Sequence, residues 1–518
     1  MTLTELLNNE IILDTEAKDF IELQLASDLD IRIYPNSISQ YEKNTFFIGK
    51  QNEVKYLFIV SGLPSDKTAD AFEGIDINAG ENKSIIKRCS LNCNNAASIQ
   101  KIFPFTNPVL LGLSNSFGFG DRIGFANSAH LRSLSGSGFK PVLAQQSIRE
   151  LTRTGRVPAD VMSAAVWAVF QEGYKDGFGA DADHLKTTAD IDLMISNGFT
   201  MFTFDPGEHV INEADVLPID TLTQKIKSLP WESLNDDFDS MLKRYEHISF
   251  NLGEGFEIVP LKEEILRATL KYGGAIAHIN NLYKHIIKNH SNKPFEVEVS
   301  VDETESVTTP FEHFFIASEL YRLGVKIISL APRFIGEFEK GIDYKGDIEI
   351  FKEEYLKHVK VAEYFGSYKI SLHSGSDKFT VYKAIGSLKR GYTHVKTAGT
   401  SYLEALRVVA AVNPEVFREI LDFSRELYLV EKETYHVSAD INKVSESKQY
   451  NNEELLDLFN QDDARQVLHV TFGKVLTIKD DSGKYIFKDK IYNCLIDNEN
   501  VHYNFIIKHF KRHLEPFN

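Results

Sequence analysis

The chain has 518 residues, a formal net charge of −17 and 43% hydrophobic residues, which is the composition of a globular protein with a large core. The negative charge argues against nucleic-acid binding, because phosphate backbones bind clusters of Lys and Arg. No segment reaches the roughly 18 consecutive apolar residues that span a bilayer, so no membrane association is expected.

The first 100 residues predict a small α+β extension. The N-terminus is acidic and lacks the basic and apolar regions of a secretory signal, so we expect a cytoplasmic protein. Short strand-like runs then occupy residues 31–37, 44–50 and 54–62, separated by polar turns.

Residues 101–400 alternate short apolar runs with longer amphipathic segments, which is typical of parallel βα units. Eight such runs with helical crossovers favour a closed (β/α)8 TIM-type barrel, an α/β fold. The candidate strands are residues 108–114, 140–146, 177–184, 198–205, 294–302, 324–331, 368–374 and 391–397.

Two segments depart from this alternation. A connection at about residues 206–290 is far longer than the usual 2–6 residues of a βα loop, so we expect a subdomain there, and we raise the hypothesis of a lid. Residues 401–518 predict a helical C-terminal extension. Its three tail histidines, His502, His509 and His513, are expected to face solvent.

Barrel enzymes place their reacting groups at the carboxyl ends of the strands, and ionisable residues gather at those ends here. Asp183 and His184 are neighbours at one such end. Side chains alternate along a strand, but both can turn toward one pocket where the strand frays. This pair suggests a base beside a metal ligand; the alternative is an N-capping Asp beside a satisfied polar His.

The run 294–302 places Glu298 and Asp302 on one face and three valines on the other. We predict that the polar face looks into the barrel, because an outward face is covered by helices and should be apolar. The opposite orientation would point Glu298 among the helices.

A second histidine, His373, ends another strand and precedes a turn of small residues, Ser374–Ser376, whose N–H groups could hold anionic oxygens beside Lys378. His184 and His373 could share a divalent metal. The residues do not single out a third ligand, for which the candidates are His394, Glu298 and Asp302.

Six motifs along the chain carry a family resemblance: GFGADADH, GFTMFTFDP, EVSVDETE, RFIGEFEKGIDYKGD, YKISLHSGSDKF and HVKTAGTSYLEA. Together they resemble the tagaturonate/fructuronate epimerases, which are metal-dependent sugar-acid epimerases. The resemblance implies that Asp183 is the proton acceptor, Glu298 the proton donor, and His184 and His373 metal ligands. It also implies one divalent cation, with Zn, Mn, Ni and Co all open; no dinucleotide fingerprint is visible, so nicotinamide is not expected.

The resemblance further implies a small keto sugar acid as substrate, interconverted at C4 by a retro-aldol route, and it leaves open the neutral ketoses tagatose and fructose and a homo-oligomeric state. The substrate carboxylate needs a cation, and Arg333 is the candidate for a bidentate contact. Other candidates for substrate binding are Gln146, Asp302, Lys340, Ser374, Lys378 and Lys396. The alternatives are a class II aldolase-like lyase and a catalytically silent sugar-acid-binding barrel.

Overall fold

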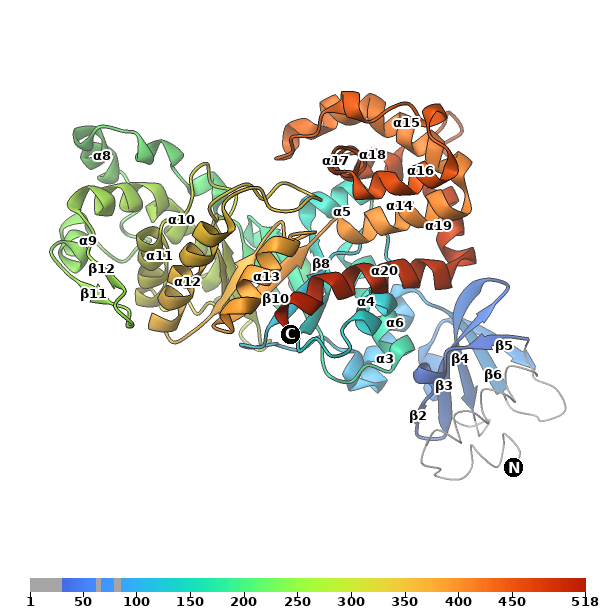
Figure 1. Ribbon diagram of the computed structural model, residues 1–518. Coiled ribbons are helices and arrows are strands. Elements are labelled where there is room, and N and C mark those ends of the chain that lie inside the picture. Colours follow the sequence, from blue (N-terminus) through green and yellow to red (C-terminus); the bar gives the residue numbers. More distant parts are fainter. Residues whose placement is uncertain (1–29, 62–66, 79–84) are drawn as a thin grey trace.

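The computed structural model describes residues 30–61, 67–78 and 85–518, which form a small antiparallel sheet, a central barrel surrounded by helices, and a bundle of C-terminal helices (Figure 1). The acidic N-terminal stretch, for which we expect no secretory signal, lies outside these residues. None of the helices in the described ranges is long and apolar enough to cross a membrane.

The barrel is closed by eight parallel strands whose order around the barrel follows their order in the chain. This confirms the predicted fold class, and seven strands lie within or next to the predicted runs. The strands are β7 (Ser116–Phe119), β8 (Lys140–Ser147), β9 (Gly179–Leu185), β10 (Met201–Phe204), β13 (Glu296–Ser300), β14 (Ser329–Ala331), β15 (Lys369–Leu372) and β16 (Tyr392–Thr397).

The prediction for the first strand was wrong: residues 108–114 are outside the sheet, and β7 follows them. The backbone N–H groups of Leu111 and Gly112 donate to the carboxylate of Glu296, at the amino end of β13. The segment therefore lies against the end of the barrel opposite the functional loops. β7 escaped notice because Gly118 interrupts its strand pattern; a Cβ on Gly118 would lie 1.7 Å from Gln145 Oε1, so a larger residue would displace the Gln145 side chain.

Helices cover the outside of the barrel, and their starts follow the capping chemistry of the sequence. Ser147, Thr187 and Thr309 each accept a hydrogen bond from the first turn of the helix that follows. The helices are α4 (Asn127–Ser133), α5 (Ile148–Thr154), α6 (Pro158–Glu172), α7 (Thr188–Ser196), α10 (Lys262–Asn289), α11 (Pro310–Arg322), α12 (Ile348–Tyr364), α13 (Phe379–Leu388) and α14 (Thr400–Val412).

The N-terminal part is a twisted antiparallel sheet followed by one helix, as predicted. Its buried residues, including Phe46, Ile59 and Phe103, join the same apolar core as α6. The elements are β1 (Arg32–Ile33), β2 (Ser39–Tyr41), β3 (Asn44–Gln51), β4 (Val54–Ser61), β5 (Gly74–Asn78), β6 (Ile85–Ser90) and α3 (Cys93–Ile102).

The long connection between β10 and β13 forms a lobe beside the barrel (Figure 1). It contains α8 (Ile219–Ile226), α9 (Phe238–Tyr245), β11 (Phe250–Asn251) and β12 (Glu257–Ile258). Leu222, Ile226 and Leu270 belong to a small apolar cluster of its own. No residue of this lobe lines the cavity described below, so nothing in its position supports the lid hypothesis.

The C-terminal extension is helical, and its last helix packs against α4 and α14. The expectation of solvated tail histidines was wrong: His502, His509 and His513 are 2%, 5% and 0% exposed. They lie on the same face of α20 as Ile506 and Phe510, at helical spacing, and this face covers the barrel. The remaining helices are α15 (Pro414–Glu431), α16 (Asn452–Asp457), α17 (Asp462–Val470), α18 (Phe472–Thr477), α19 (Lys488–Asp497) and α20 (Glu499–Leu514).

Candidate active site

A bulge at the end of β9 turns two sequence neighbours toward one cavity. The pairing of β9 with β10 shifts register between Phe202 and Phe204, and His184 adopts a left-handed φ of 50°. Asp183 and His184 both line the cavity as a result. The prediction that both side chains face one pocket is confirmed. The strained backbone of His184 lies in the wall of this pocket, where the catalytic residues are expected.

A buried lysine, Lys396 of β16, joins three carboxylates in the barrel interior. Its Nζ lies 2.7 Å from an oxygen of Asp181, 2.7 Å from Asp183 and 2.8 Å from Glu298. These contacts confirm that Glu298 points into the barrel. Burial raises the pKa of Asp183, but Lys396, His184 and His373 together outweigh burial and hold that pKa well below its usual range. Asp183 is therefore a carboxylate at neutral pH.

Glu298 lies below the cavity floor, fully buried, and does not line the cavity itself. Its Oε1 is 2.6 Å from His373 Nε2, and its Oε2 has no hydrogen-bond partner. The Nε2 contact fixes the ring of His373 and leaves Nδ1 toward the cavity, 3.2 Å from Asp302 Oδ1.

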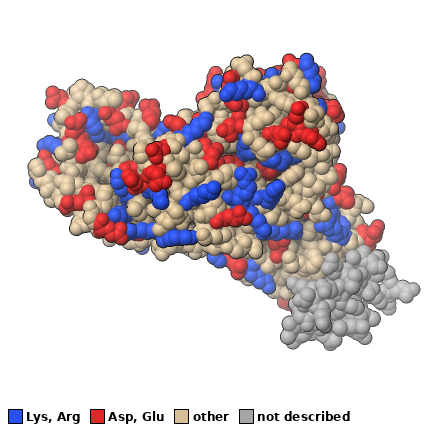
Figure 2. Space-filling view, viewed as in Figure 1, with Lys and Arg blue, Asp and Glu red and all other residues tan. Residues whose placement is uncertain are grey.

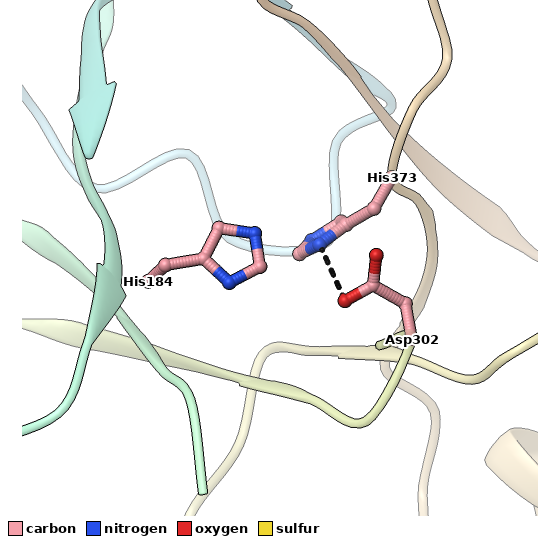
Figure 3. A group of neighbouring side chains, drawn as sticks. All are labelled: His184, Asp302 and His373. Carbon is pink, nitrogen blue, oxygen red and sulfur yellow. Dashed lines mark ion pairs between the residues drawn. The ribbon is translucent and has the colours of Figure 1, made fainter. Parts of the chain in front are cut away.

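Two imidazoles and one carboxylate converge at the carboxyl end of the barrel (Figure 3). Ligand atoms of His184, Asp302 and His373 all lie within 4.8 Å of one another. Nitrogen and oxygen donors of this kind suit a divalent transition-metal ion. The donor set therefore fits the cation that the resemblance implies, with Asp302 in the third position.

The carboxylates around these imidazoles favour positive charge. Burial lowers the pKa of His184, but Asp183 and Asp205 outweigh burial and raise the pKa to about 10. Burial lowers the pKa of His373 too, and Asp302 raises it to about 9. Protons or a divalent cation can supply the positive charge that this pocket attracts.

Three residues predicted for the site lie elsewhere. His394 is deeper in the barrel, where its Nδ1 is 2.9 Å from Ser116 Oγ, and it is not part of the ligand group. Gln146 pairs with Ala182 on the strand face that packs against helices, so its neighbour Gln145 lines the cavity instead. Lys378 Nζ donates to three backbone carbonyls, including Glu339 O at 2.8 Å, and does not line the cavity.

Above the ligand group the cavity has an inner chamber of about 50 Å³ and an outer vestibule of about 280 Å³. Asp302, Lys340 and Ser374 line both parts, whereas Arg333 lines only the vestibule. The surface of the molecule is notched between the lobe that contains α8 and the C-terminal helices, and acidic and basic groups intermingle over this face (Figure 2).

Comparisons with known proteins identify the family and support the fold. The family model of the tagaturonate epimerase UxaE matches residues 34–517. The chain belongs to the tagaturonate epimerase family. A tagaturonate/fructuronate epimerase from Thermotoga maritima is 43% identical over 488 residues, which cover 93% of this chain and 96% of that protein.

Solved structures agree with this assignment to the epimerase family. Crystal structures of the fructuronate-tagaturonate epimerase UxaE from Cohnella laeviribosi, one native and one complexed with one glycerol, each match with a TM-score of 0.89 and 37% identity. Each match covers 97% of this chain and 99% of that chain. The family and the isomerase class implied by the motifs are confirmed, and so is the barrel predicted from the alternation of strands and helices.

Sequence reasoning missed part of this epimerase's cavity wall. Tyr435 and His469 belong to the C-terminal extension, and both line the inner chamber. Arg122, from the loop after β7, lines the same chamber. No motif singles out Tyr435 or His469, because the C-terminal extension meets the barrel only in the folded chain.

Proposed function

We propose that this epimerase interconverts D-tagaturonate and D-fructuronate at C4 by a metal-dependent retro-aldol route. The observation that carries the proposal is that an ionised carboxylate, Asp183, faces the same small chamber as the ligand group of His184, Asp302 and His373. A base and a Lewis-acid site next to each other are what carbon–carbon cleavage beside a ketone requires.

The substrate's own chemistry favours this route. Tagaturonate and fructuronate, numbered as 2-ketoses, differ at C4, whose hydrogen is β to the ketone and not acidic. Enolisation therefore does not reach this centre. Breaking the bond between C3 and C4 does, because the resulting C4 aldehyde is planar and can be attacked on its other face.

Asp183 accepts the proton of the C4 hydroxyl as the C3–C4 bond breaks. The bonding electron pair moves onto C3 and the C2 carbonyl, which gives an enediolate and an aldehyde. Rotation of the aldehyde and attack by C3 restore the bond, and the proton returns to the C4 oxygen. Lys396 contacts both Asp183 and Glu298, so Glu298, which does not line the chamber, would act on this proton only through Lys396 and Asp183.

His184, Asp302 and His373 would hold the divalent cation, which supplies Lewis-acid stabilisation of the enediolate charge. The imidazole and carboxylate donors suit Zn, Mn, Ni or Co. The neutral ketoses tagatose and fructose have the same reacting carbons, so we propose that they react too, but more slowly because they lack the carboxylate that anchors the substrate.

The test is the conversion of D-tagaturonate by chelator-stripped protein in D₂O, with each metal added back singly and the product followed by NMR. We expect metal-dependent fructuronate formation with hydrogen retained at C4. Deuterium at C4 would rule out the retro-aldol route, and equal rates with and without chelator would rule out metal dependence. Release of three-carbon fragments without epimer would favour the lyase alternative.

A further inference from the structure

The inner chamber contains an arginine with an unused hydrogen-bonding group. The Nε and one terminal nitrogen of Arg122 bind Glu150 Oε1, at 3.0 and 2.9 Å. Its guanidinium carbon lies 3.6 Å from the centre of the Phe472 ring. The other terminal nitrogen has no partner, although the side chain is only 3% exposed. These contacts fix the guanidinium and leave two N–H donors free.

A histidine in the same wall is also without partners. His469 of α17 is 1% exposed, lines the chamber, and neither of its ring nitrogens makes a hydrogen bond. Gly399 provides the space for this ring, because a Cβ there would lie 2.0 Å from His469 Cε1. A neutral imidazole offers one N–H donor and one acceptor.

Lys340 adds a positive charge at the edge of the chamber. Its Nζ donates to Ser374 Oγ at 2.5 Å, and no carboxylate of the described residues lies within ion-pair distance of it. Lys396, by contrast, is already paired with three carboxylates. Lys340 is thus the lysine of this chamber whose charge remains available to an anion.

Buried polar groups without partners destabilise the folded chain, so a group of them around one chamber indicates a polar ligand. We propose that Arg122, Lys340 and His469 form the subsite that binds the C6 carboxylate of the uronate substrate. This rests on the proposed function. It differs from the sequence expectation of a bidentate contact with Arg333, although Lys340 was among the candidate cations. Arg333 lines only the vestibule, where its guanidinium binds the backbone carbonyl of Thr304.

The subsite also explains how an epimerase avoids acting as a lyase. After C3–C4 cleavage, the fragment C4–C6 carries the aldehyde at one end and the carboxylate at the other. A carboxylate held by Arg122 and Lys340 keeps this fragment in place while the aldehyde turns about the C4–C5 bond. Weakening the subsite should therefore release fragments as well as weaken binding.

The experiment compares Lys340→Met and His469→Gln with the unaltered enzyme. Losing one hydrogen bond to a charged group should raise KM for D-tagaturonate by roughly 10- to 100-fold. It should weaken by a similar factor the binding of tartronate, a stable analogue of the fragment C4–C6, measured by calorimetry. Dihydroxyacetone, which forms from the fragment C1–C3, should appear in both variant reactions. Lys357→Met, on the outer helix α12, is the matched lysine control and should change none of these readouts.

Unchanged KM and unchanged tartronate affinity in both variants would overturn the subsite. So would Arg333→Gln producing the losses while Lys340→Met does not, which would place the carboxylate in the vestibule. If His469→Gln fails to fold, Gly399→Ala displaces the same ring through its added Cβ and should give the same losses. Absence of tagaturonate turnover by the unaltered enzyme would instead refute the proposed function, and tartronate binding would still test the subsite.

Discussion

At the level of single residues, the site depends on Asp183 and His184 facing the same chamber although they are neighbours in a strand. Their adjacency at a strand end was visible in the sequence. The bulge and the left-handed backbone of His184 were not, because both arise from the pairing of β9 with β10. The sequence thus predicted which residues form the pair but not the backbone geometry that aligns them.

Replacing Asp183 with Asn should lower kcat for tagaturonate by about 10²- to 10⁴-fold, the usual contribution of a general base. The amide keeps the size of the side chain but cannot accept the C4 hydroxyl proton. Initial rates of tagaturonate conversion at saturating metal and substrate measure kcat. Asp192→Asn, an exposed carboxylate on α7, is the control and should retain full activity. Retention of activity by Asp183→Asn would remove this residue from proton transfer.

Replacing Lys396 with Met should destabilise the folded protein by about 3–5 kcal/mol at neutral pH, because it leaves buried carboxylates without their cation. Asp181, Asp183 and Glu298 would then repel one another in the barrel interior. Urea unfolding of the metal-free protein gives the free energy of unfolding. A loss no larger than that of the exposed control Lys357→Met would contradict this account of the network.

At the level of elements, the sequence predicted best where side chains alternate. In β13 the alternation correctly placed Glu298 inside and the valines outside. It failed for β7, whose Gly118 makes close contacts with β8 and β16 that only the closed barrel creates. It also failed for α20, where the helical spacing of His502, His509 and His513 was present but their polarity suggested solvent.

One of these elements, α20, holds the N-terminal sheet through a buried ion pair: Lys55 Nζ lies 2.5 Å from Glu499 Oε1. Burial raises the pKa of Glu499, but Lys55 outweighs burial and lowers the pKa to about 2. Because the folded-state pKa lies below the unfolded value, the stabilisation is present above about pH 4.5 and is lost as the pH falls toward 2.

Glu499→Gln should therefore reduce the free energy of unfolding by roughly 3 kcal/mol at pH 7. The difference between the two proteins should shrink below about pH 4.5, where the glutamate of the unfolded chain becomes protonated, and should be lost near pH 2, where the folded protein also takes up the proton. Urea unfolding of both proteins at a series of pH values measures this difference in the free energy of unfolding. A difference that stays constant from pH 7 to pH 3 would show that the substitution acts through packing and not through charge.

At the level of the whole molecule, three distant parts of the chain build the chamber. Asp183 and His184 come from the barrel, Arg122 from the loop after β7, and His469 from the C-terminal extension. The strand-end residues were predictable because the barrel fold fixes where strand ends meet. The part of the wall formed by His469 was not predictable, because contacts between distant segments follow no local pattern.

The cation that we propose would join residues at the ends of β9, β13 and β15, so its removal should lower the thermal stability of the whole protein. A ligand that binds only the folded state at 100 times its Kd stabilises it by about 2.7 kcal/mol. We expect chelator treatment to lower Tm by a few degrees and one of Zn, Mn, Ni or Co to restore it.

His184→Ala should abolish this metal-dependent shift, because it removes one of the imidazoles of the ligand group. His285→Ala is the matched control: His285 belongs to another group of two histidines and one aspartate, with Asp192 and His290, on the surface. If the shift persisted in His184→Ala and disappeared in His285→Ala, the stabilising cation would be bound at the surface and the chemistry proposed for the barrel would lose its Lewis acid.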